Sequence, residues 1–267
     1  MNPIIISVIC LCVIFLATTL GSSLVFFFKK SYSERTGSIV VGLASGIMIA
    51  TSFFGLLLPS IEESRILYGD KISVLPVVCG FLLGGILLYL LDKIVPHLHK
   101  DSDVAEGIKT DKINARVKFI LAVTIHNIPE GISVGLLCGY AIGATTNIDT
   151  ACLGALSLAI GIAIQNLPEG SAVSIPLLED GVSKPKAFLL GTLTGVVEPI
   201  FAFFAIFLAA FLQESLPYLL SFAAGAMIYV TIDELVPEIK NKSQHSHFGL
   251  WSFMIGFVIM TCLEMLL

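Results

Sequence analysis

Charged side chains are scarce in this sequence. They make up 13% of the 267 residues, whereas an average soluble domain carries about 25%, and the mean hydropathy is high, at +0.94. So few charges exclude a disordered chain, a nucleic-acid-binding protein with a basic surface and an ordinary soluble enzyme. The six cysteines have no framework spacing, so they do not indicate a disulfide scaffold. What remains is a polytopic membrane protein.

Long apolar runs dominate the rest of the sequence. A helix that crosses a bilayer needs about 20 mostly apolar residues, and eight such runs are present. Backbone polar groups in hydrocarbon must be paired, and a two-residue alternation is absent, so we expect helices and not barrel strands. The predicted fold class is all-α, a single transmembrane domain over 1–267. Its spans are predicted at about 3–28, 37–60, 73–92, 116–141, 150–177, 186–212, 217–238 and 248–267.

The basic residues determine the expected orientation. If the N-terminus faces outward, 13 of the 15 Lys and Arg residues fall in inner connections, and only Arg65 and Lys71 fall outside. Cytoplasmic loops are enriched in Lys and Arg, so we expect both termini to be extracytoplasmic. The longest connection, about 93–115, is then cytoplasmic, and chemistry has to take place inside the bundle because the other loops are short. The absence of targeting extensions favours a bacterial inner membrane.

One motif occurs twice, near the centres of the fourth and fifth runs. His126-Asn127-Ile128-Pro129-Glu130-Gly131 is followed 39 residues later by Gln165-Asn166-Leu167-Pro168-Glu169-Gly170, on a span of opposite direction. A charged residue at the bilayer centre costs about 2.5 kcal/mol or more on insertion scales. Two glutamates at matching depths therefore indicate a functional site.

The spacing within the motif predicts that this site binds a metal. His126 and Glu130 are four residues apart and share one helix face, as do Gln165 and Glu169. The two motif asparagines lie on an adjoining face, and each motif proline removes a helical donor and frees a carbonyl. Imidazole, amide, carboxylate and carbonyl groups between two helices suit a divalent transition metal, with imidazole favouring zinc and its neighbours over calcium or magnesium.

A third intramembrane acid, Glu198, precedes Pro199 near the middle of the sixth run. It allows a two-ion site with bridging glutamates. One cluster would contain His126, Glu130, Gln165 and Glu169, and the other Asn127, Glu130, Asn166, Glu169 and Glu198. Other readings stay open, because a proline-linked glutamate can be a kink with a proton-relay carboxylate. Glu198 alone can also pair with a lysine or a hydroxyl group.

These residues resemble the ZIP (Zrt/Irt-like) family of metal transporters. The second motif copy, with Val197-Glu198-Pro199 in the next span, is most similar to the GufA-like branch. The resemblance covers essentially the whole chain. It implies a homodimer of 3+2+3 helix bundles with inverted repeats. It also implies metal influx toward the cytoplasm through the fourth and fifth spans, by a carrier-like movement of part of the bundle.

The resemblance also implies ligands by position. The main transport site corresponds to His126, Glu130, Gln165 and Glu169, and the adjacent second site includes Asn127, Asn166 and Glu198. Met48 resembles a thioether ligand of this branch, although a buried methionine is otherwise an ordinary core residue. Other members carry a second histidine at the position of Gln165 or an aspartate at that of Asn166, so the amides here weaken the second site. No cofactor is implied; zinc is the expected substrate, with Cd2+, Fe2+ and Mn2+ as other candidates.

Polar residues near the predicted membrane surfaces are candidates for a metal entrance and exit. The inner candidates include two H-x-H pairs, which are a weak signal of metal binding. All of these residues can equally be solvated loop or interfacial groups. The outer candidates are Glu62 and Glu63, and the inner ones are His97, His99, Asp233, Glu234, Glu238, His245 and His247.

Two other functions fit parts of the pattern. An intramembrane metal-dependent hydrolase needs an open metal position and a general base and usually a third His or Asp ligand, yet only His126 lies within a span. A proton-coupled carrier of organic solutes would use the motif glutamates as proton relays at a helix break, but the clustered amide and imidazole groups argue against it. We therefore predict a transporter of divalent metal ions in the lipid bilayer, not an enzyme.

Overall fold

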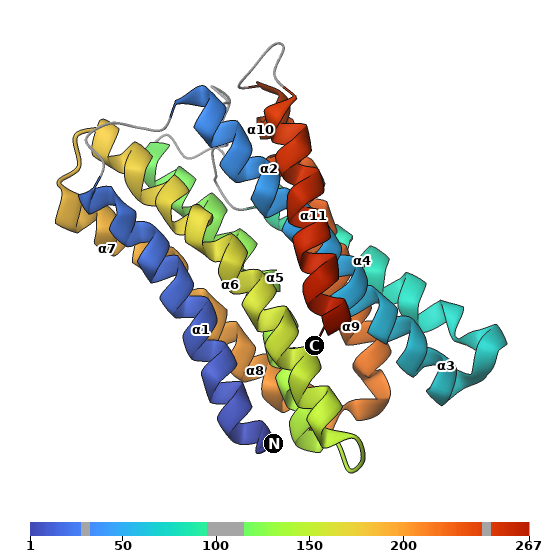
Figure 1. The fold of residues 1–267 in the computed structure, drawn as a ribbon. Helices are drawn as coiled ribbons and strands as arrows, with labels where there is room; N and C mark the ends of the chain where they lie inside the picture. The colour runs from blue at the N-terminus through green and yellow to red at the C-terminus, as the bar shows by residue number, and fades with distance from the viewer. Residues whose placement is uncertain (28–32, 95–114, 242–246, 267) are drawn as a thin grey trace.

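The computed structural model describes residues 1–27, 33–94, 115–241 and 247–266, and every regular element within these ranges is helical (Figure 1). The prediction of an all-α fold is confirmed. The elements are α1 (Pro3–Ser23), η1 (Leu24–Phe26), α2 (Glu34–Ala50), η2 (Thr51–Leu57), α3 (Leu58–Ile72), α4 (Val74–Ile94), α5 (Ala115–Gly143), α6 (Ile148–Glu179), α7 (Lys184–Thr194), α8 (Val197–Phe211), η3 (Gln213–Ser215), α9 (Leu216–Val230), η4 (Thr231–Leu235), α10 (Val236–Asn241) and α11 (Phe248–Leu266).

Seven helical segments of the described residues are long and apolar enough to cross a membrane, as expected of an integral membrane protein. The 29-residue helix α5, predicted as the fourth span, is not among the seven. It carries the polar first motif copy, and it packs against α8, α6 and α9. The seven segments are Pro3–Phe26, Arg35–Ile72, Val74–Leu91, Ile148–Leu178, Lys184–Phe211, Gln213–Leu235 and Phe248–Leu266.

Some helices differ in detail from their predicted runs. The second helix continues past residue 60 as far as a kink at Gly69, whose φ is 71°, and a short further piece ends at Ile72. The second helix contains a π-helical segment, η2, and the seventh contains another, η4. Wide π-helical turns are frequent at functional sites. The sixth run is divided between α7 and α8, where the amide of Glu198 bonds the carbonyl of Gly195 at 3.2 Å. Pro199 has no N–H to donate, which favours this break.

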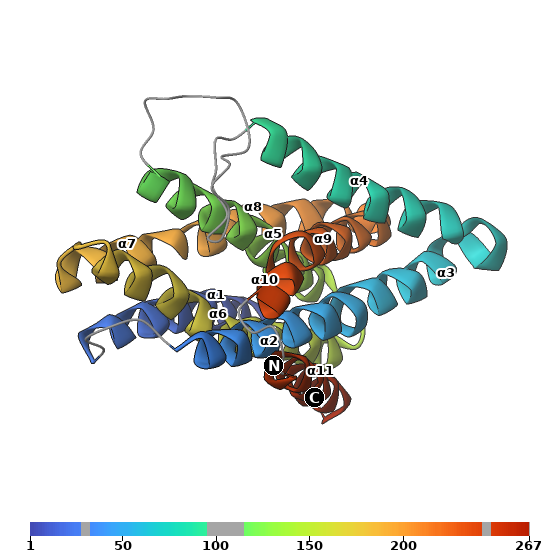
Figure 2. The same ribbon diagram turned by 90° about the horizontal axis from the view of Figure 1, so that it is seen from above.

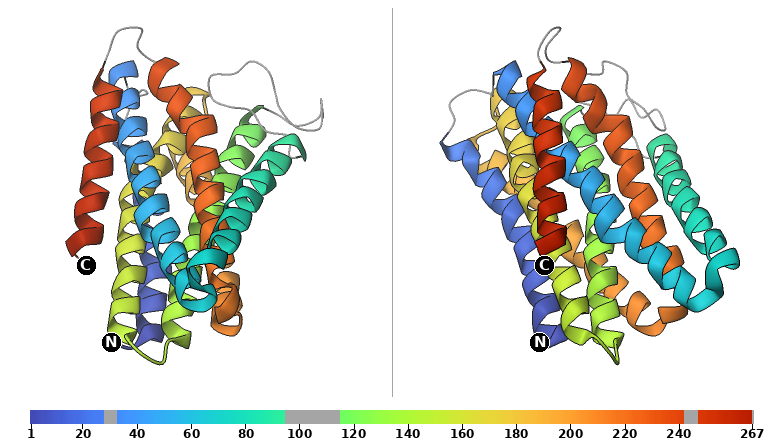
Figure 3. Two further views of the ribbon diagram at one scale, coloured as in Figure 1. Left: turned by 90° about the vertical axis from the view of Figure 1, so that its right-hand side faces the viewer. Right: turned by 45° about the vertical axis from the view of Figure 1, so that its right-hand side comes forward.

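The helices form two groups that reflect the inverted repeat. In the first group α1 packs most closely on α6 and α5 on α8, with α7 beside α6 and α1. In the second group α2 and η2 pack on α11, α4 packs on α9, and α3 packs on α9, α4 and η2. The segments η4 and α10, which continue from α9, pack on α2. The right-hand view of Figure 3 shows α1 and α4 at opposite edges of the molecule. Seen from above, α1, α6 and α7 gather on one side and α3 and α4 on the other (Figure 2). The α1–α6 pair corresponds to α8–α5, and the α2–α11 pair to α9–α4.

Backbones touch within each group, whereas side chains separate the groups. A Cβ added to Gly170 would lie 2.2 Å from the carbonyl oxygen of Thr18 on α1, and one added to Gly46 would lie 2.0 Å from a carbonyl oxygen on α11. Small residues allow such close helix contacts in membranes. Between the groups, Gly161 on α6 instead faces the flexible end of the Met260 side chain on α11. The two groups are therefore packed more tightly internally than against each other.

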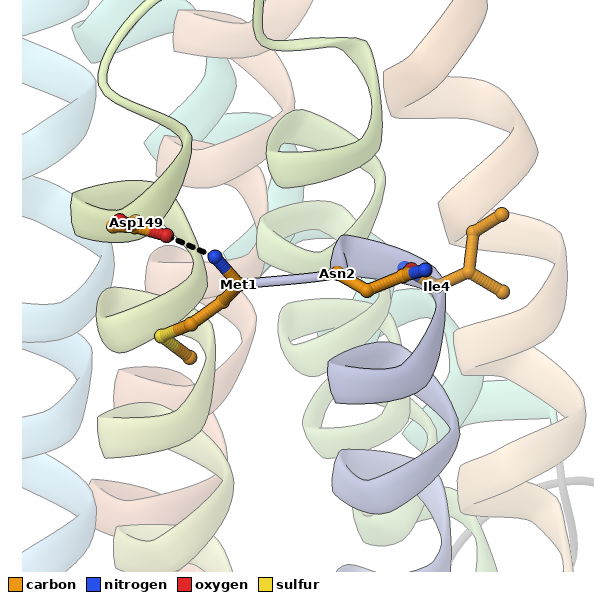
Figure 4. Close-up of polar contacts among 4 residues, drawn as sticks. All are labelled: Met1, Asn2, Ile4 and Asp149. Atoms are coloured by element: carbon orange, nitrogen blue, oxygen red, sulfur yellow. Dashed lines mark hydrogen bonds and ion pairs between the residues drawn. The ribbon is translucent and has the colours of Figure 1, made fainter.

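The start of α1 is tied to the start of α6. The amino group of Met1 is paired with the carboxylate of Asp149 (Figure 4). This carboxylate raises the pKa of the Met1 amino group above its ordinary value. The side chain of Asn2 accepts a hydrogen bond from the amide of Ile4 at 3.0 Å, so Asn2 is the N-cap of α1.

Candidate metal centre

The two motif copies meet where α5 and α6 pack together. Both helices continue through their motif prolines, so the spacing read from the sequence is preserved. The motif glycines bring in two more helices, because Gly131 lies against the backbone of α8 and Gly170 against that of α1. Four helices therefore surround the motif side chains.

Gln165 connects the two motif glutamates. Its amide nitrogen Nε2 donates to Glu130 Oε1, and to Glu169 Oε2 at 3.2 Å. Glu130 and Gln165 are each 1% exposed, and Glu169 is partly buried. The structure thus brings together three of the four residues predicted for the main site.

His126, the fourth of these residues, is buried on α5 and contacts a different acid. Its Nε2 atom is paired with Glu234 Oε1 on η4. Glu234 had been predicted as an exit residue near the membrane surface. The structure places its carboxylate against His126, so η4 of the second helix group borders the candidate centre.

Glu198 accepts hydrogen bonds from three side chains. Thr18 Oγ1 on α1 donates to Glu198 Oε1 at 2.9 Å, and Asn127 Nδ2 donates to the same oxygen at 3.3 Å. Asn166 Nδ2 donates to Glu198 Oε2 at 2.6 Å. The predicted association of Glu198 with both motif asparagines is therefore present, and Thr18 is a partner that the sequence did not indicate.

Several acceptor oxygens in this region have no hydrogen-bond donor within the described part of the chain. Buried acceptors are normally paired, because an unpaired one costs free energy. A cation would satisfy them. These atoms are Glu130 Oε2, Glu169 Oε1, Gln165 Oε1, Asn127 Oδ1 and Asn166 Oδ1.

The described residues contain no group of three or more His, Cys, Asp or Glu side chains arranged to hold an ion. A ligand set built here would therefore need amide oxygens from Gln165, Asn127 or Asn166 beside the carboxylates. Such an oxygen-rich set with one imidazole is chemically able to bind a divalent metal.

Met48 on α2 belongs to the same buried core cluster as Ile125 on α5 and Ile162 on α6. It is buried, and its sulfur is 3.6 Å from Thr231 Oγ1 at the start of η4. A second buried methionine, Met227, accepts a hydrogen bond from Ser133 Oγ at 3.2 Å. Met227 is not among the residues expected from the sequence, although the repeated pattern A-x-G-x-M-I at 44–49 and 223–228 marks both methionines.

The predicted entrance and exit residues are dispersed. Glu63 accepts a hydrogen bond from Tyr140 Oη at 2.7 Å, whereas Glu62, Asp233 and His247 are exposed. A further acid, Glu264 on α11, was not singled out from the sequence, although its position in an apolar run is a signal; its Oε1 atom is buried without a hydrogen-bond partner in the described region. The side chain of Glu238 lies outside the described residues, as do His97, His99 and His245.

Comparison with known proteins gives matches along almost the whole chain. A family model described as "ZIP Zinc transporter" matches residues 3–118 and 106–264. The chain is 36% identical to "Zinc transporter GufA" of Myxococcus xanthus, over 93% of this chain and 94% of the relative. It is 32% identical to "Zinc transporter ZIP11" of Homo sapiens, over 92% and 93%, and 32% identical to "Zinc transporter ZIPB" of Bordetella bronchiseptica, over 94% and 77%.

Proposed function

The chain belongs to the ZIP zinc transporter family and is a zinc transporter; from this premise we propose that zinc passes toward the cytoplasm through the cluster between α5 and α6. Glu130, Gln165, Glu169 and His126 form the main binding site. Asn127, Asn166 and Glu198 form its adjacent part. Zinc is the principal substrate, and Cd2+, Fe2+ and Mn2+ are further ions that such ligands accept.

The observation that carries this proposal is the set of unpaired buried oxygens on Glu130, Gln165 and Glu169. The carboxylates of Glu130 and Glu169 share one donor, the Gln165 amide, so they have more oxygen atoms than the hydrogen bonds described here pair. A divalent cation would neutralise both charges and occupy the unpaired oxygens, which lowers the cost of holding it away from water. The same residues would release the ion when their separation changes.

The direction of transport is inferred from the distribution of basic residues. With the termini outside, Glu62 and Glu63 border the outer side, and Asp233 and Glu234 lie between the centre and the inner side. The contact between the Glu234 carboxylate and His126 supports an exit role for Glu234. An ion leaving Glu130 and Glu169 would meet this pair on its way to the cytoplasm.

Uptake of radioactive zinc into cells tests the site. Glu130→Gln and Glu169→Gln keep the size of each side chain but remove its charge, and we expect each to abolish uptake while the protein still reaches the membrane. The matched control is Glu214→Gln, because Glu214 is an exposed acid on η3. Normal uptake by either site variant would show that the transported ion does not use this cluster.

A further inference from the structure

We propose that Thr18 is a positioning residue for metal binding, which acts through Glu198 to hold the amide oxygens of Asn127 and Asn166 toward the ion. The inference rests on the proposed function, since it concerns the same cluster. Thr18 lies on α1, outside both motif copies, and is 1% exposed. Its role follows from the hydrogen bonds that orient the two asparagines.

Backbone carbonyls determine which end of each asparagine amide faces Glu198. Asn127 Nδ2 donates to the carbonyl of Thr194 at 3.2 Å and to Glu198. Asn166 Nδ2 donates to the carbonyl of Ile14 at 3.4 Å and to Glu198. Carbonyl and carboxylate oxygens only accept, so a rotated amide would place oxygen against oxygen at both contacts. The amide oxygens must therefore point away from Glu198, and both are buried without a donor among the described residues.

The carbonyl of Thr194 is available because the helix is broken there. The amide of Glu198, four residues later, bonds the carbonyl of Gly195 instead, at 3.2 Å. The following residue, Pro199, has no N–H. The break between α7 and α8 thus supplies the acceptor that orients Asn127.

Thr18 completes the set of donors around the Glu198 carboxylate. Its hydroxyl donates to Oε1 at 2.9 Å, the atom that Asn127 also contacts. Glu198 is fully buried, and a buried carboxylate depends on such donors to hold its position. Without the Thr18 hydroxyl, the carboxylate can rotate, and the two asparagines lose the fixed acceptor that they share.

The inverted repeat makes Thr18 the counterpart of Glu198. A Cβ at Gly170 would lie 2.2 Å from the carbonyl oxygen of Thr18, and one at Gly131 would lie 2.3 Å from that of Glu198. Ile14, whose carbonyl accepts from Asn166, lies four positions before Thr18. Thr194, whose carbonyl accepts from Asn127, lies four positions before Glu198. The repeat therefore places a hydroxyl donor on α1 opposite a carboxylate acceptor on α8. Two ionised carboxylates at these positions would repel each other, whereas a hydroxyl group can donate to the carboxylate.

Cadmium binding to the purified full-length protein tests this role, with 113Cd NMR as a readout of the ligands. Thr18→Val removes the hydroxyl at nearly constant volume, and Thr18→Ser keeps it. We expect the valine variant to bind Cd2+ about tenfold more weakly, as for other groups that orient ligands, with a changed 113Cd chemical shift. The serine variant should restore both values.

Thr19→Val is the matched control, because the Thr19 hydroxyl bonds only the carbonyl of Phe15 in its own helix among the contacts described. It should leave affinity and chemical shift unchanged. An unchanged affinity and shift in Thr18→Val would overturn the positioning role while leaving the site intact. Equal losses in the valine and serine variants would assign the effect to packing and also overturn it. If the unsubstituted protein does not bind Cd2+, the proposed binding site itself is wrong.

Discussion

The hydroxyl of Tyr140 on α5 donates to Glu63 Oε1 on α3 at 2.7 Å. This hydrogen bond joins the two helix groups, since α5 packs with α6 and α8, whereas α3 packs on α4, α9 and η2. It lies 14 positions along α5 from His126, which contacts the second group through Glu234. A relative movement of the two groups would have to break or exchange such contacts.

A double-mutant cycle measures the contribution of this contact. Tyr140→Phe and Glu63→Ala each remove one partner, and we expect a coupling free energy of about 1 kcal/mol, typical of a partly buried hydrogen bond. The free energy of unfolding in detergent micelles is the quantity to compare among the four proteins. Strictly additive effects would indicate that the two side chains do not interact in the folded protein.

Two glycines of α6 should respond oppositely to alanine. Gly170→Ala would place a Cβ 2.2 Å from the Thr18 carbonyl, and separating α6 from α1 should lower the free energy of unfolding by about 1–3 kcal/mol. Gly154→Ala is the control, because a Cβ there meets no atom within 4 Å. Because alanine has a higher helix propensity than glycine, Gly154→Ala should raise the free energy of unfolding by up to about 1 kcal/mol. Equal stability of the two variants would contradict the close packing of α1 and α6.

Removal of metal should destabilise the folded protein. Zinc that binds only the folded state at 100 times its Kd adds about 2.7 kcal/mol to the free energy of unfolding. This zinc-dependent increase in the free energy of unfolding should disappear when a chelator is added, and also in the double variant Glu130→Gln, Glu169→Gln. Thermal unfolding with and without zinc measures the effect. An unchanged zinc response in the double variant would place the stabilising ion elsewhere.

The six thiols should separate into two classes of reactivity. Cys10, Cys138 and Cys152 are buried between helices, and the other three are exposed on helix faces. These three lie in membrane-spanning helices and face lipid or detergent, so N-ethylmaleimide, which enters micelles, should label them in the purified folded protein and label the three buried thiols only after unfolding. The exposed thiols are Cys12, Cys79 and Cys262. Mass spectrometry of the labelled peptides identifies the sites, and rapid labelling of Cys138 would contradict the packing of α5.

Much of the architecture follows from local properties of the sequence. Apolar runs long enough to cross a bilayer predict helices, because a backbone in hydrocarbon has to pair its own polar groups. The repeated motif in turn predicts the meeting of Glu130 and Glu169, since glutamates at matching depth on adjacent antiparallel spans face a common region. Predicted helix ends were less accurate, as α3 shows by continuing past residue 60 to the kink at Gly69. Apolar content does not mark where a helix leaves the membrane.

The sequence by itself thus determined the helical class, the family and the matching depth of Glu130 and Glu169 on adjacent helices. Only the tertiary structure decided which partners these side chains have, as with Thr18 at Glu198 and Glu234 at His126. The physical reason is that apolar periodicity and motif spacing describe one helix at a time. Contacts between α1 and α8, or between α5 and η4, depend on how whole helices cross, and that is set by packing among residues distant in the chain.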